Sequence, residues 1–198
     1  MNKKEKTKEL IINKTKELIV KNSDVTIKDI ADACFINIAA VNYHFGSKDN
    51  LIGIVINDLI NNLKEQIFIE VEKLDQSVDL KASLATMLEI IYNFTLGNTG
   101  VIRYLFLNKD YQQNSTNILI DSFFSDNDFT KKILAYIMKG FKIDDVTIAY
   151  AKYMVLFSAF SIPLFIEIAK SSNDNIISSI EYDFFKETYI SEILKLLN

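Results

Sequence analysis

A single histidine and a single cysteine limit the chemistry open to this chain of 198 residues. A nucleophilic triad needs a histidine beside a nucleophile and an orienting acid, and a structural zinc site needs about four Cys or His ligands. His44 and Cys34 supply neither, and the sequence has no glycine-rich phosphate loop and no paired carboxylates with a base. We therefore expect no enzyme, no metal site and no cofactor. Cys34 is interpreted as a small buried apolar residue rather than a redox sensor.

Residues 26–48 offer a different chemistry, which is contact with a nucleic-acid duplex. An asparagine amide can bond bidentately to adenine, and small apolar side chains can touch thymine methyl groups. Hydroxyl, imidazole and ammonium groups can donate to phosphates. The candidates for base contacts are Lys28, Asn37, Ile38, Ala39, Ala40 and Asn42. The candidates for phosphate contacts are Thr26, Tyr43, His44 and Lys48.

Several of these candidates have a plainer interpretation. Ala39 and Ala40 could simply favour a helix. Lys28 could reach a phosphate instead of a guanine edge, and a lone histidine is more often structural than functional. The lysines at positions 3, 4, 6 and 8 could form a mobile arm on the DNA backbone, although a solvated helix start is the favoured interpretation.

Two short, separately capped helices are predicted to position the candidates. Thr26 and Asp29 have capping-box spacing, which predicts a helix from Thr26 to about Cys34. Asn37 can cap a second helix over Ile38–Phe45. Helical phasing places Val41 and Phe45 on the buried side of this second helix, while Asn37 through Tyr43 are otherwise left outward. Two such helices about three residues apart are the outline of a helix-turn-helix.

The rest of the chain is also predicted to be helical, since it has only one proline and five glycines. Gly46 suits the stop of the second short helix, and Ser47 can cap the next one. Hydrophobic periodicity predicts helices at 3–22, 47–73, 79–96, 99–107, 115–140, 144–171 and 181–197. Ser125 to Asp128 could interrupt the helix 115–140, and Pro163 should kink the helix 144–171. The expected fold class is all-α.

Residues 26–51, TIKDIADACFINIAAVNYHFGSKDNL, resemble the TetR family of bacterial repressors, most specifically from Asn42 to Leu51. The resemblance implies an N-terminal three-helix helix-turn-helix DNA-binding domain, residues 1–46. It also implies a C-terminal helical-bundle domain for ligand binding and dimerisation, residues 47–198. Phe35, Ile38 and Asn42 depart from the family pattern, which usually has glycine, a polar residue and tyrosine there.

The resemblance further implies a small-molecule pocket within the C-terminal bundle. The aromatic-rich segment 92–165 suits an apolar cavity, although most of its rings should simply form the core. Arg103, the only arginine, could pair with an anionic ligand, but an internal ion pair or a snorkelling surface position is favoured. The candidate pocket residues are Tyr92, Arg103, Tyr104, Phe123, Tyr136, Tyr153 and Phe157.

Pairing of the last two helices with a second copy is the third implication. Apolar stripes over Ile148–Ile168 and within 181–197 could form a four-helix interface, or could pack within the monomer instead. The candidate interface residues are Phe160, Leu164, Tyr182, Phe185, Tyr189 and Ile193.

Charge and hydropathy agree with a cytoplasmic DNA-binding protein. Residues 1–50 carry nine lysines and seven acids, whereas the remainder has a net charge of −6, as expected if only the first part meets phosphates. We expect no signal peptide and no membrane span, because Met154–Ala169 is too short and polar. The hypothesis is a ligand-responsive regulator, most simply a repressor. It would bind a palindromic operator as a homodimer, and a small apolar or amphipathic effector of unknown identity would release it. The alternative is an architectural or division-associated DNA-binding protein of the same fold, without small-molecule control.

Overall fold

All the secondary structure in the described part of the chain is helical, which confirms the predicted all-α class. The computed structural model describes residues 2–20, 22, 24–74, 80–107, 112–159, 163, 166 and 183–196. Of the helices with described bounds, none is both long and apolar enough to span a membrane.

The chain divides into two compact units. Unit 1 comprises Met1–Asn61 and Gly97–Ile118, and unit 2 comprises Asn62–Leu96 and Leu119–Asn198. One long helix, α4 (Lys48–Leu74), starts in unit 1 and continues into unit 2. The functional boundary expected at residues 46/47 stays a prediction.

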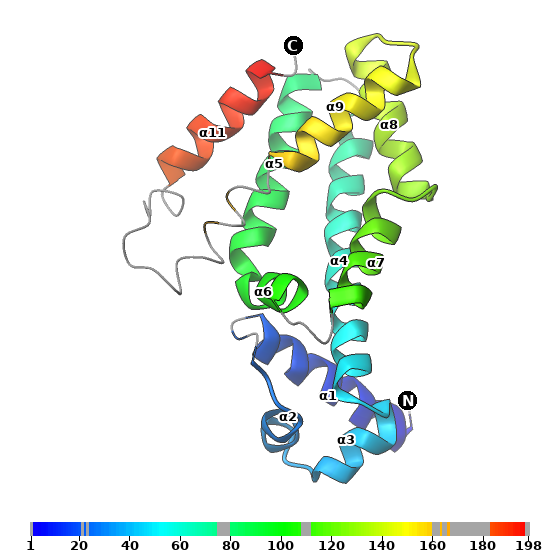
Figure 1. The fold of residues 1–198 in the computed structure, drawn as a ribbon, viewed down its shortest axis with the longest axis vertical. Coiled ribbons are helices and arrows are strands. Elements are labelled where there is room, and N and C mark those ends of the chain that lie inside the picture. The colour runs from blue at the N-terminus through cyan, green and yellow to red at the C-terminus, as the bar shows by residue number, and fades with distance from the viewer. Residues whose placement is uncertain are drawn as a thin grey trace. The chain divides into compact units, whose positions relative to one another are not determined.

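Unit 1 contains α1 (Lys3–Ile19), α2 (Ile27–Ala33), α3 (Ile38–Phe45), the start of α4, α6 (Thr99–Leu107) and the start of α7 (Gln112–Phe123) (Figure 1). A capping box begins α1: the Asn2 side chain accepts from the Glu5 N–H, and the Glu5 carboxylate accepts from the Asn2 N–H. The helical start at Lys3 supports the solvated helix-start interpretation of the N-terminal lysines. α1 ends at Ile19, three residues before the predicted end at 22.

Helix α6 is hydrogen-bonded to two other helices of unit 1. The Gly100 N–H donates to the Val20 carbonyl, directly after α1, over 3.0 Å. The Tyr104 hydroxyl donates to Asp49 Oδ1, in the first turn of α4, over 2.8 Å. Tyr104 is 1% exposed, so this phenol–carboxylate hydrogen bond is formed at a buried ring. α6 therefore fixes the end of α1 and the beginning of α4 together.

Unit 2 contains most of α5 (Leu80–Gly97), the end of α7 (Gln112–Phe123), α8 (Asp128–Phe141), α9 (Val146–Ser158) and α11 (Asp183–Leu196). α8 and α9 pack against each other. The predicted helix 144–171 is observed up to Ser158. Beyond Ala159, only Pro163 and Ile166 of that segment are described, both as helical, so the predicted kink lies outside the described residues.

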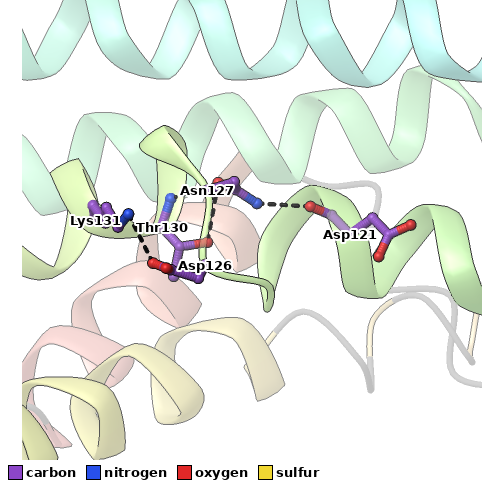
Figure 2. Close-up of polar contacts among 5 residues, drawn as sticks. All are labelled: Asp121, Asp126, Asn127, Thr130 and Lys131. Carbon is purple, nitrogen blue, oxygen red and sulfur yellow. Dashed lines mark hydrogen bonds and ion pairs between the residues drawn. The ribbon is translucent and has the colours of Figure 1, made fainter.

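The predicted interruption of 115–140 is confirmed, because α7 and α8 are separate helices joined by a polar turn (Figure 2). Asn127 bridges both sides of the break. Its Oδ1 accepts from the Thr130 N–H at 2.9 Å, and its Nδ2 donates to the Asp121 carbonyl at 2.6 Å. Lys131 adds an ion pair with Asp126 at 2.9 Å. A side chain that caps one helix and satisfies the end of the other makes the break more favourable than a continuous helix.

An aromatic cluster lies in the interior of unit 2. The Phe123 ring lies 5.7 Å from that of Phe129 and 5.5 Å from that of Phe157, centroid to centroid. The Tyr153 hydroxyl donates to the Phe123 carbonyl over 2.6 Å. Burial, and to a smaller degree the neighbouring Tyr150, raises the pKa of Tyr153 above its ordinary value. The Tyr153 hydroxyl therefore remains neutral and donates to the last residue of α7.

Candidate nucleic-acid interface

The first helix of the predicted helix-turn-helix begins at a complete capping box. The Asp29 N–H donates to Thr26 Oγ1 at 3.1 Å, and Asp29 Oδ2 accepts from both the N–H and the hydroxyl of Thr26, at 2.8 and 2.6 Å. These bonds, the one from the Thr26 hydroxyl foremost, lower the pKa of Asp29. The predicted start of α2 at Thr26 is confirmed. Because the Thr26 hydroxyl proton is already donated to Asp29, the backbone N–H groups after it are the freer donors at this exposed helix start.

The turn between α2 and α3 has a left-handed residue that is not glycine. The Phe35 N–H donates to the Asp32 carbonyl and the Ile36 N–H to the Ala31 carbonyl, which is the bonding pattern of a Schellman motif. That motif places Phe35 at a φ of 55°, where glycine is the usual residue. The phenyl ring is 97% exposed.

Helix α3 directs its two buried side chains inward, as predicted. Asn37 caps the helix by accepting from the Ala40 N–H at 2.7 Å. Val41 and Phe45 are buried, which confirms the phasing. The Asn37 oxygen is occupied by the cap, so its amide N–H₂ is the group left to reach DNA.

The predicted base-contact residues lie at the surface of unit 1. Asn37, Ala39 and Asn42 are exposed, Ile38 is 41% exposed and Ala40 is half-buried. Lys28 is exposed on α2. Ile38 is an aliphatic side chain that folding leaves partly in water at the first position of α3.

The predicted phosphate-contact residues are held near the ends of α2 and α3. Tyr43 is 73% exposed, Thr26 is exposed, and His44 and Lys48 are half-buried. The Tyr43 and His44 rings meet edge to face at 5.3 Å. The ammonium group of Lys48 lies 5.9 Å from the centre of the Tyr104 ring, which keeps its charge close to the start of α4.

The bend after α3 sets the position of Lys48. Gly46 has a φ of 75° and donates its N–H to the Asn42 carbonyl at 2.8 Å. A Cβ there would meet no atom within 4 Å, so glycine is required by the backbone angle and not by space. Ser47 Oγ then accepts from the Asn50 N–H, which confirms the predicted cap of the next helix.

Two lysines of α1 contact rings of α3, although the interpretation favoured from the sequence is a solvated helix start. Lys4 Nζ is 5.2 Å from the centre of the exposed Tyr43 ring, and Lys8 Nζ is 5.8 Å from that of Phe45. Both are cation–π contacts. The contact of Lys4 places positive charge beside the outward Tyr43, whereas Lys8 lies over a ring on the buried side of α3. Their spacing of one helical turn on a lysine-rich face was the available signal.

The candidate pocket residues are distributed over both units. Phe123, Tyr153 and Phe157 belong to the aromatic cluster of unit 2, whereas Tyr92 is buried on α5 and Tyr136 is half-buried on α8. Arg103 and Tyr104 lie on α6 in unit 1. The Tyr104 hydroxyl is bonded to Asp49, and the buried Nε of Arg103 has no hydrogen-bond partner among the residues that the structure describes.

Three of the candidate dimer residues, Phe160, Leu164 and Tyr182, lie outside the described residues. On α11, the half-buried rings of Phe185 and Tyr189 stack at 5.6 Å, and the Tyr189 hydroxyl donates to the Ala159 carbonyl. Ile193 is only 4% exposed in the single chain. It packs within the chain, which is the alternative that the sequence left open for this stripe.

Comparison with known proteins identifies a family that the helix-turn-helix region of the chain resembles. Residues 11–53 match the model for bacterial regulatory proteins of the tetR family, a span that contains α2, α3 and most of α1. The N-terminal part of the chain is thus a TetR-type helix-turn-helix domain, and the resemblance seen in the sequence is confirmed. No curated protein matches the chain by sequence.

Solved structures show that the TetR-type fold extends over the whole chain. A TetR-family transcriptional regulator from Mesorhizobium loti is 13% identical with a TM-score of 0.70, over 100% of this chain and 97% of that one. The regulator FadR from Bacillus subtilis, in complex with stearoyl-CoA, is 14% identical with a TM-score of 0.65, over 96% of both chains. AibR, in complex with isovaleryl coenzyme A and operator DNA, is 14% identical with a TM-score of 0.57, over 96% of this chain and 97% of that one.

Proposed function

We propose that this protein is a transcriptional regulator that binds double-stranded DNA through α3. The observation that carries the proposal is the division between two sides of α3 and its cap. Val41 and Phe45 are buried, whereas the exposed residues are Asn37, Ile38, Ala39, Asn42 and Tyr43. In a helix-turn-helix the second helix enters the major groove with its N-terminal residues at base edges. Both short helices are capped by their own side chains, so the outward face is held rigidly before DNA arrives.

The proposed division of labour follows from chemistry and exposure. Asn42 would bond bidentately to an adenine, and Ala39 and Ala40 would contact thymine methyl groups. Lys28 would reach a guanine edge or a phosphate. The N–H groups at the start of α2, Tyr43, His44 and Lys48 would hold phosphates. The cation of Lys4, over the Tyr43 ring, adds positive potential beside this face.

We further propose that two copies act together on a palindromic operator, most simply as a repressor. A single helix-turn-helix domain makes too few contacts with DNA for sequence-specific binding at cellular salt concentrations. Two helix-turn-helix domains related by a twofold axis would bind operator half-sites about 34–36 Å apart or a multiple of that distance. The similar structure of AibR holds operator DNA, which supports this use of the fold. The α11 ring pair of Phe185 and Tyr189 is the proposed part of the contact between copies.

An acyl-coenzyme A is the first effector class to test. Two of the similar structures hold one, stearoyl-CoA in FadR and isovaleryl coenzyme A in AibR. Such ligands combine an apolar tail with an anionic head. The aromatic cluster of unit 2 suits the apolar tail.

The experiment is selection from a random-sequence duplex pool by the purified protein at low ionic strength, followed by titration of salt. We expect an enriched palindrome and an affinity that falls linearly on a log–log salt scale. Lys48→Ala should reduce the slope by about 1, whereas Lys131→Ala, at the α7–α8 turn, should leave it unchanged. Adding stearoyl-CoA or isovaleryl coenzyme A, with free coenzyme A as control, tests release. A protein that retains no duplex at low salt would refute the regulator proposal.

A further inference from the structure

Phe35 is unfavourable for folding in two respects. Its φ of 55° is a left-handed conformation, which is strained for an L side chain and unstrained for glycine. Its ring is 97% exposed, so folding recovers almost none of the free energy that burial of a phenyl group supplies. Strained residues that are not stabilised by their own packing are found preferentially at ligand-binding sites. The combination therefore points to an interaction outside the folded chain.

The position of Phe35 identifies the occupant. It lies in the α2–α3 turn, two residues before the cap of α3, and the turn leads directly into that helix (Figure 1). Ile38, the first residue of α3, is the next exposed apolar side chain. The same end of α3 is the end that a helix-turn-helix presents to base edges.

Major-groove chemistry narrows the contact to one group. Nearly everything that base pairs present there is a hydrogen-bond donor or acceptor, and the 5-methyl group of thymine is the apolar exception. A phenyl ring can gain nothing from the polar edges, but it can bury itself against a methyl group. We propose that Phe35 reads a thymine methyl at the edge of each operator half-site, together with Ile38. This inference rests on the proposed function. It adds the identity of one base, thymine, that the helix-turn-helix domain prefers in each half-site.

Stability and affinity should therefore respond in opposite directions at this one residue. Phe35→Gly removes both the backbone strain and the ring, so it should raise Tm by about 2–4 °C and weaken operator binding about five- to tenfold. Phe35→Ala removes the ring and keeps the left-handed strain, so it should weaken binding to a similar degree without raising Tm. Lys142, at a φ of 54° after α8, is the matched control. Lys142→Gly should raise Tm and leave DNA binding unchanged.

The decisive experiment uses the duplex that the wild-type protein selects from the random pool. Each thymine of a half-site is replaced in turn by deoxyuridine, which removes only the methyl group. Replacement at one or two of these positions should lower the affinity of the wild-type protein about three- to tenfold. At one of these positions, the same replacement should not lower the affinity of Phe35→Gly. If the pool yields a palindrome but Phe35→Gly and wild type respond alike to every replacement, Phe35 is not the reader and this inference is wrong. If the pool yields no enriched duplex, the proposed function itself fails.

Discussion

The hydrogen bond from Tyr104 to Asp49 should position the DNA-binding helices, and Tyr104→Phe tests this. The substitution removes one hydroxyl from a ring that is 1% exposed and leaves the ring itself in place. α6 would then stay attached to the end of α1 through Gly100 and Val20, but would lose its bond to the first turn of α4. That turn directly follows the bend after α3.

The magnitude follows from the two partners. A hydrogen bond to a charged group contributes about 1.5–3 kcal/mol net, and the lower end applies here because Asp49 is half-buried and water can replace the phenol. About 1.5 kcal/mol corresponds to a fall in Tm of about 3–6 °C for a chain of this size. If about half or more of that free energy holds the helix-turn-helix in its DNA-binding geometry, operator affinity should fall about three- to tenfold.

Tyr153→Phe is the matched control for this experiment. It also removes a buried tyrosine hydroxyl, but one within unit 2 that donates to the Phe123 carbonyl. Both variants should lose comparable stability in thermal unfolding. Only Tyr104→Phe should lose operator affinity in fluorescence anisotropy measured well below either Tm. Equal operator affinities for the two variants would refute the positioning role of Tyr104.

Three further predictions concern the DNA contacts, the α2 cap and the contact between copies. Asn42→Ala should relax preference at one base pair by about 1–3 kcal/mol while leaving the salt slope unchanged; an unaltered ranking of operator variants would count against the adenine contact. The carboxyl of Asp29 should titrate by NMR below its ordinary pKa, so its stabilisation of the α2 cap is complete above that pKa and is lost as the pH falls through the lowered value. Asp29→Asn should weaken this pH dependence. Phe185→Glu should yield monomers in sedimentation, whereas a dimer of wild-type affinity would exclude the Phe185–Tyr189 pair from the interface.

Local hydrogen bonds made the two helices of the helix-turn-helix, α2 and α3, predictable from the sequence. The starts of α2 and α3 are set by Thr26 with Asp29 and by Asn37, side chains that bond to the backbone three residues away. The break between α7 and α8 is likewise set by Asn127 within its own turn. Such signals need no knowledge of the tertiary structure, so the boundaries of α2 and α3 could be predicted to within one residue.

Contacts between distant residues were beyond the sequence. Tyr104 has the appearance of one more aromatic core or pocket residue until packing brings it to Asp49, 55 positions away. Lys4 is one of many lysines until α1 places it over Tyr43. Phe35 was visible as a departure from the glycine of the family pattern, but its exposure depends on the path of the turn. Propensity and periodicity carry no information on which far residues meet.

Helix α4 makes the Tyr104–Asp49 bond relevant to regulation, because it begins in unit 1 and continues into unit 2. A ligand can alter DNA affinity only through states that differ in their interactions with it, and typical coupling free energies are about 1–3 kcal/mol. Retaining or losing one phenol–carboxylate bond is a difference of that size. An effector that displaced α6 would break this bond at the first turn of α4, directly after the bend that follows α3. If this is the coupling step, the Tyr104→Phe variant should retain ligand binding and show a smaller ligand-induced change in operator affinity than wild type.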